Sequence, residues 1–169
     1  MAFSAGQKLT ADLLNAAFDR RRRVYQTSDI SVTNSATLVS STDMVLSMEV
    51  SAIYSVDMYL ITDGNSTGDA KYNLLVPTGA LVVKHSRWGG TSSDTTVTAA
   101  PHRQSLDQGS MDLSGVAFGT RVASKPSAVI AMGSTAGSCT FQFAQNTANN
   151  TNPSMLLAGS WMELVKLSA

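Results

Sequence analysis

Few side chains in this sequence could do chemistry, and their spacing favours packing over catalysis. The chain has two histidines, His85 and His102, and one cysteine, Cys139. Neither histidine belongs to a short-spaced metal motif such as HxxxH or CxxC, so no zinc site is predicted. Cys139 alternates with Phe141 and Phe143 along a predicted strand, where a buried thiol packs as a small apolar group. We expect neither a metal nor a cofactor.

Hydrolytic sites are not predicted either. The serines lack a GxSxG turn, and there is no Cys-His signature. A triad of a serine with His102 and Asp107 is formally possible, but the composition of the chain explains it by chance. Glycan cleavage needs two carboxylates at a set separation, and the sequence singles out no pair among Asp94, Asp107 and Asp112. The chain is therefore expected not to be an enzyme.

Trp88 and Arg87 are the residues that could hold a ligand. An exposed aromatic plane beside hydrogen-bonding groups suits a sugar ring, which would make a host cell-wall glycan the ligand. The alternative, a tryptophan in the core or at a subunit interface, stays open. The polar stretch 91–108 that follows is long enough for a surface loop with functional contacts.

Charge and composition restrict the partners. The 12 basic and 12 acidic side chains balance, and charged residues make up 14% of the chain, so no net field would hold nucleic acid or an anionic membrane. At 169 residues and 43% hydrophobic, the chain can bury one ordinary core. Its start lacks the pattern of a secretory signal, and no apolar run approaches the roughly 20 residues of a membrane span. Folding in the cytoplasm is expected.

The segment 1–23 is predicted to be a docking arm that contains a helix from Thr10 to about Arg22. Thr10 can cap the helix, and apolar residues recur at helical spacing after it. A helix of this length is marginal alone, so its apolar stripe needs a partner. The arginine run would complement the carboxyl end of the helix or pair with an acidic partner. The residues expected to dock are Leu9, Leu13, Leu14, Phe18, Arg20, Arg21, Arg22 and Arg23.

Residues 24–169 are predicted to form a single β-domain. From Val24 the apolar period changes from helical to two, and Tyr54, Val56, Met58 and Leu60 make the clearest strand. The segments 72–76 and 81–84 flank a Pro-Thr-Gly turn and are expected to form a hairpin. About eight or more strands with short turns favour an antiparallel, jelly-roll-like β-sandwich after the N-terminal helix.

The last strand predicts self-association. Trp161 and Val165 fall on one of its faces, Met162 and Leu164 on the other, so neither face is cleanly polar. In a sandwich the outer face of such a strand needs cover from a neighbouring subunit or a loop. We expect a homo-oligomer, with a trimer favoured. The residues assigned to the subunit interface are Tyr54, Tyr59, Trp161, Met162 and Leu164.

Several segments resemble a family of small minor tail proteins from tailed phages that infect actinobacteria. The resemblance begins with FSAGQKLT followed by Leu14 and Asn15, and continues at QTSD, STD, YSVDMYL, QFAQNT and AGSW, whose ranges are 26–29, 41–43, 54–60, 142–147 and 158–161. The last segment is also loosely similar to the closing strands of trimeric C1q/TNF-like jelly rolls.

The resemblance implies a virion structural protein, minor tail or tail-associated, whose partners are other virion proteins. The family's pattern carries no catalytic residues onto this chain. Two alternatives stay open, a capsid decoration or head fibre protein and a receptor-binding module for a host glycan. In each case the protein would assemble into particles in the host cytoplasm.

Overall fold

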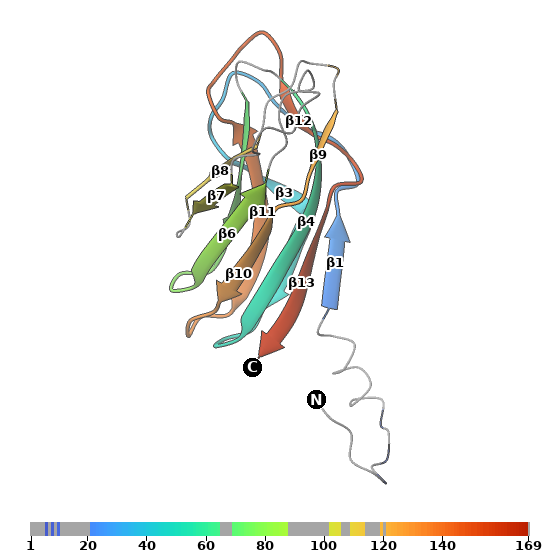
Figure 1. Cartoon of the computed structure of the whole chain (residues 1–169), viewed down its shortest axis with the longest axis vertical. Helices are drawn as coiled ribbons and strands as arrows, with labels where there is room; N and C mark the ends of the chain where they lie inside the picture. The colour runs from blue at the N-terminus through green and yellow to red at the C-terminus, as the bar shows by residue number, and fades with distance from the viewer. Residues whose placement is uncertain are drawn as a thin grey trace.

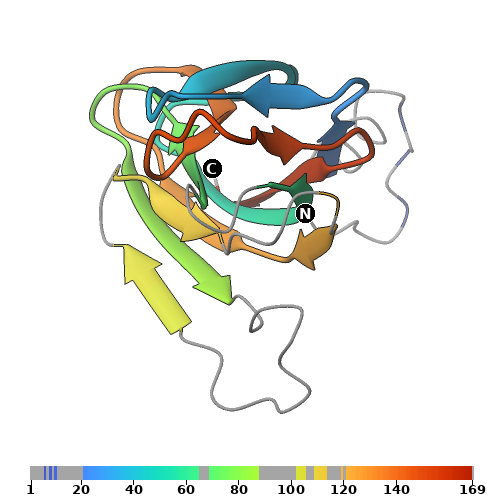
Figure 2. The ribbon, with the colours of Figure 1, turned by 90° about the horizontal axis from the view of Figure 1, so that it is seen from above.

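A computed structural model describes most of the chain, and these residues form two antiparallel β-sheets that face each other (Figures 1 and 2). No helix occurs among them. The mainly β, two-sheet class predicted from the sequence is confirmed. The described residues are 6, 8, 10, 21–64, 69–87, 102–105, 109–113, 119 and 121–168.

The larger sheet has nine strands. Its continuous path runs β1-β13-β4-β10-β6-β7, and β4 also pairs with β9 and β12, while β12 pairs with β2. The long β4 thus holds four neighbours at different points along its length. The strands are β1 (Arg21–Tyr25), β2 (Ile30–Val32), β4 (Ile53–Asp63), β6 (Leu81–Arg87), β7 (His102–Ser105), β9 (Val122–Ser124), β10 (Ser127–Ala131), β12 (Ser154–Leu156) and β13 (Trp161–Ser168).

The smaller sheet has four strands in the order β3-β11-β5-β8. Its central pair joins Phe141 of β11 to Leu74 of β5, and Phe143 to Tyr72. A register shift between Thr140 and Gln142 marks a bulge against β3, which lets the longest strand of this sheet bend over the core. The strands are β3 (Val39–Met48), β5 (Ala70–Leu75), β8 (Met111–Leu113) and β11 (Gly137–Gln145).

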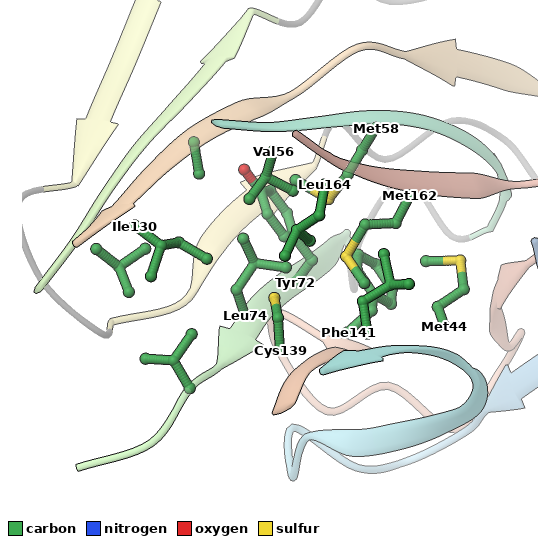
Figure 3. Packing of buried hydrophobic residues seen from close by; sticks show 14 of the residues in the cluster. Met44, Val56, Met58, Tyr72, Leu74, Ile130, Cys139, Phe141, Met162 and Leu164 are labelled. Atoms are coloured by element: carbon green, nitrogen blue, oxygen red, sulfur yellow. The ribbon is translucent and has the colours of Figure 1, made fainter. Parts of the chain in front are cut away.

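The core lies between the sheets and follows directly from period-two alternation (Figure 3). Every second residue of β4, from Tyr54 to Leu60, points inward and is at most 1% exposed. From the opposite sheet Cys139, Phe141 and Phe143 are fully buried, as the sequence predicted. Tyr72 of β5 stacks on Phe141 of the neighbouring β11 with ring centroids 5.9 Å apart, which reinforces the pairing of these two strands on the inner face of the smaller sheet.

The turn after β5 was predicted correctly, but the hairpin was not. Gly79 has a positive φ of 84°, and the Ala80 amide donates to the Pro77 carbonyl at 3.1 Å. The flanking strands do not pair with each other: β5 pairs with β11 and β8, whereas β6 pairs with β10 and β7. The Pro-Thr-Gly turn therefore carries the chain from one sheet to the other.

The predicted helix end at Arg22 is wrong, because Arg21–Tyr25 is β1 and pairs in register with β13. Backbone hydrogen bonds to β13 decide the conformation of these residues. The rest of the proposed helix, from residue 11 to residue 20, lies outside the described residues, together with Leu9, Leu13, Leu14, Phe18 and Arg20.

Candidate interaction surface

Three of the residues predicted for a subunit interface lie in the chain's own core. Tyr54, Met162 and Leu164 are each 0% exposed. Met162 stands opposite Met58 of β4, and both are in the core cluster. The prediction is wrong for these three side chains, since a residue that the monomer already covers has no surface to offer a second subunit.

The other two, Tyr59 and Trp161, lie on the outer face of the nine-stranded sheet. They are directly opposite each other in the β4-β13 pair. Their rings stack with centroids 6.3 Å apart and an interplanar angle of 13°. Stacked aromatic side chains on an outer sheet face leave an apolar plane accessible beside hydrogen-bonding groups, an arrangement found in binding surfaces.

Two of the predicted docking arginines meet the carboxylate of Glu163 on the same face. Arg23 Nη2 lies 2.8 Å from Oε2 and Arg21 Nε lies 3.0 Å from Oε1. A second bond from Arg23 Nε, 3.0 Å long, also reaches Oε2. The side chain of Glu163 is 5% exposed, whereas those of Arg21 and Arg23 are 69% and 53% exposed. The carboxylate is buried beneath its two cations.

Arg23 joins the ionic group to the aromatic one. Its guanidinium carbon lies 4.4 Å from the centroid of the Trp161 ring, within the range of a cation–π contact. Tyr25, the residue opposite Trp161 in β1, is 64% exposed. We call this set the arginine–tryptophan surface; it consists of Arg21, Arg23, Tyr25, Tyr59, Trp161 and Glu163.

The arginine–tryptophan surface occupies one end of the strand order, where β1 pairs with β13. The intervening Arg22 points the other way, and its Nη1 donates to Ser47 Oγ of β3 at 3.1 Å. This bond ties the edge strand to the second sheet. The three arginines, which looked like one cationic run in the sequence, therefore act on two different faces because side chains alternate along a strand.

Further along the same outer face the exposed side chains are apolar. Val129 of β10 lies opposite Ser55 and Val83, and it is 46% exposed. Ile53 and Leu81, which flank Ala131 in the next row, are 38% and 59% exposed. The outer face of this sheet thus carries charged and aromatic side chains at the β1 end and apolar ones towards β6.

Glu163 is the functional residue that sequence reasoning missed. A carboxylate between Met162 and Leu164 in a strand needs a cation when it is buried, so the strand itself signalled a partner. The arginine run was visible as well. The sequence could not show that Arg23 and Glu163, which are 140 positions apart, come together in the fold.

The ligand residues predicted from the sequence are only partly placed. Arg87 is the last residue of β6, and its side chain, like Trp88 as a whole, lies outside the described residues. His102 begins β7, where its backbone pairs with Arg87. Within the described part of the chain, no group of three His, Cys, Asp or Glu side chains could hold a metal ion. Nor do these residues include a helix long and apolar enough to span a membrane.

Comparison with known proteins does not place the chain in a family. No family model matches it, and no curated protein matches it. Among solved structures, the infectious bursal disease virus VP2 subviral particle aligns at 11% identity over 89% of this chain, with a TM-score of 0.21. The Gx strain of the same virus aligns at 12% identity over 89% of this chain, with a TM-score of 0.17. The chain spans 38% of each viral chain. Likeness at these TM-scores carries no argument about function.

Proposed function

We propose that this chain is a structural component of a bacteriophage particle, most specifically a minor tail or tail-associated protein. The segment before β1 would dock onto another virion protein through Leu9, Leu13, Leu14 and Phe18. The β-sandwich would then be displayed on the particle. The role is architectural, without catalysis on an external substrate, and the protein would join particles as they assemble in the host cytoplasm.

The observation that carries the proposal is the position of the arginine–tryptophan surface beside the docking segment. Arg21 directly follows that segment and is the first residue of an edge strand. Arg21 and Arg23 keep 69% and 53% of their side chains exposed while they neutralise Glu163. Arginine and aromatic side chains are enriched in protein interfaces. The resemblance of residues 3–10 to small phage tail proteins supplies the virion setting.

The exposed apolar side chains support self-association as part of the same proposal. Ile53, Leu81 and Val129 lie in adjacent rows of one sheet face, and a contiguous apolar area is typical of a surface that another protein covers. Tyr59 and Trp161 extend the face towards β1. We propose that copies of the chain meet through it, with a homotrimer favoured.

Incorporation into particles tests the docking role. Phage that carry Leu13→Asp with Phe18→Asp are compared with wild-type phage and with Val50→Asp, an equivalent change at an exposed position of the sandwich. Purified particles are probed with an antibody against the chain. We expect the double variant to be missing from particles while it accumulates, folded, in the lysate. The control should incorporate normally.

Normal incorporation of the double variant would refute docking by this segment. Antibody labelling in electron micrographs gives the position on the particle: label at the tail supports the proposal. Label on the head would overturn the tail assignment in favour of capsid decoration. Light scattering of the purified protein reads the oligomeric state, and a monomer at micromolar concentration would contradict the trimer.

A further inference from the structure

Lys84 is the most unusual residue of the described core. It lies on β6 between Val82 and the end of the strand, and it is 0% exposed. Its Nζ donates to Asn73 Oδ1 at 2.6 Å and also to the Gly109 carbonyl oxygen. Both of these acceptors are neutral amide oxygens. Burial away from water disfavours the charged ammonium form of such a group, and therefore favours the neutral amine, which is a nucleophile.

Asn73 is held with its carbonyl carbon close to this amine. The carbonyl bond is about 1.2 Å long, so Asn73 Cγ lies within about 4 Å of Lys84 Nζ, near the ~3–3.5 Å of reacting atoms in a near-attack arrangement. Asn73 Nδ2 donates to Gln142 Oε1 at 3.2 Å, and Gln142 Nε2 donates to Ser40 Oγ at 3.1 Å. This chain of hydrogen bonds turns the Asn73 oxygen towards Lys84 and the nitrogen away from it.

The surroundings exclude the competing nucleophile. Asn73 is 8% exposed, and the thiol of Cys139 is buried in the core between the sheets (Figure 3). Burial raises the pKa of the Cys139 thiol to about 12. The thiol stays protonated at neutral pH and is a poor nucleophile in that form. The amine of Lys84 therefore has no thiolate beside it to compete for Asn73.

We propose that Lys84 and Asn73 form an intramolecular isopeptide bond that covalently joins the two sheets. Neutral Lys84 Nζ attacks Asn73 Cγ, and the bond from Cγ to Nδ2 breaks. One proton moves from Nζ to Nδ2, which leaves as ammonia, so atoms and electrons balance without an oxidant or a further reactant. The product is an amide between β6 and β5, whose strands share no backbone pairing.

Such a bond suits a protein that must keep its shape under mechanical load. The strands β5 and β6 follow each other in the chain, connected by the turn at residues 76–80, and each is held in a different sheet. A covalent link across this connection would stop the sheets from separating at this edge. The inference is independent of the proposed virion role, because the bond would form in the isolated chain.

The intact mass of the purified full-length protein is the direct test. We expect it to be lower than the sequence mass by one molecule of ammonia. Trypsin sharpens the test, because Lys84 is the only lysine or arginine between Lys71 and Arg87. A free Lys84 gives two peptides, 72–84 and 85–87, whereas the cross-linked form gives one peptide, 72–87. Chymotryptic cleavage inside that peptide should leave its halves joined.

Two variants distinguish the ammonia lost in isopeptide formation from ammonia lost in other reactions. Lys84→Met should restore the full sequence mass, whereas Lys166→Met, which changes a lysine of β13, should keep the deficit. A deficit that persists in Lys84→Met would indicate succinimide formation at an asparagine and would overturn the proposal. A wild-type protein at full sequence mass, cleaved by trypsin after Lys84, would overturn it without any variant.

Discussion

Glu163 and Lys84 are the two charged side chains that the described residues bury, and they are held in opposite ways. Glu163, on the outer face of β13, is covered by two guanidinium groups that keep their own contact with water. Lys84, on the inner side of β6, reaches neutral oxygens of Asn73 and Gly109. The carboxylate of Glu163 thus meets opposite charge, and the amine of Lys84 lies against the amide of Asn73.

The difference separates a docking element from a reactive one. A buried carboxylate with two cationic partners is stabilised in its charged form, so it organises the surface and does not react. An amine withdrawn from water is disfavoured as a cation, and Lys84 Nζ has the amide of Asn73 within reach. Burial alone therefore does not decide what a charged residue does; the groups that lie beside it decide as well.

The largest effect is expected for Lys84→Met. In the cross-linked chain the isopeptide bond closes a loop between positions 11 residues apart. Closure of a loop of that size stabilises by about 3 kcal/mol, and the orphaned acceptors add about 2 kcal/mol. Urea unfolding followed by tryptophan fluorescence measures the loss of free energy. Lys166→Met is the control and should change it little, because its partner Glu49 is exposed. If Lys84→Met left the free energy of unfolding unchanged, the contrast between Lys84 and Glu163 would be lost.

The double variant Arg21→Met, Arg23→Met should cost slightly less, about 4 kcal/mol, because it leaves a buried carboxylate without compensation. The same unfolding experiment measures it. Arg121→Met, at an exposed position outside this surface, is the matched control. If the double variant were as stable as the control, the arginines would not be what allows Glu163 to be buried.

Glu163→Gln should have a smaller effect of about 1 kcal/mol, since the two arginines are exposed and water can solvate them when the carboxylate is lost. Removing the anion should therefore cost less stability than removing the cations, because the acid is buried and its two bases are exposed. If Glu163→Gln and the double arginine variant lowered the free energy of unfolding equally, the difference in burial between Glu163 and its partners would not govern their effect on stability.

The smallest effect concerns the half-buried carboxylate of Asp43 and the exposed carboxylate of Glu49, which contrast with Glu163. Hydrogen bonds from Thr27 hold the pKa of Asp43 below its ordinary value of 3.8. A hydrogen bond and the charge of Lys166 hold the pKa of Glu49 below 4.5. A depressed folded pKa means stability that is present above these values and is lost as pH falls through the folded pKa.

Asp43→Asn with Glu49→Gln should therefore lower the stability slightly near neutrality and leave it unchanged in acid, where the wild-type carboxylates are protonated, so that the acid limb of the stability curve becomes flatter. Urea midpoints measured from above 4.5 to below 3.8 on the pH scale give the slope. Thr33→Ala, at an exposed position, is a control that keeps both carboxylates. A slope that matches the wild type would show that other groups govern acid unfolding.

Strand positions were predictable where one face is buried. Alternation in residues 54–60 and in 139–143 located β4 and β11, and it named Phe141 and Phe143 as core. The same rule could not tell which face of β13 was inner, because Trp161, Met162 and Leu164 are all apolar. This ambiguity is why Met162 and Leu164 were assigned to an interface.

The arginines show where local reasoning failed. In the sequence, Arg21 to Arg23 follow an apolar pattern of helical spacing, and cations at that position favour a helix end. In the fold, pairing with β13 supplies their backbone hydrogen bonds, and Glu163 supplies the charge partner of Arg21 and Arg23. Long-range pairing outweighed a local preference worth only about 0.3–1 kcal/mol.

The sequence by itself determined a mainly β chain with a buried Cys139, a turn at Gly79 and many of its strands, because turn residues and period-two alternation act over neighbouring positions. Only the tertiary structure decided that the chain changes sheets at that turn, that Arg23 meets Glu163 and that Lys84 meets Asn73. Those contacts depend on which strands become neighbours, and the packing of the whole core selects that order. The chemistry of this protein arises at such contacts.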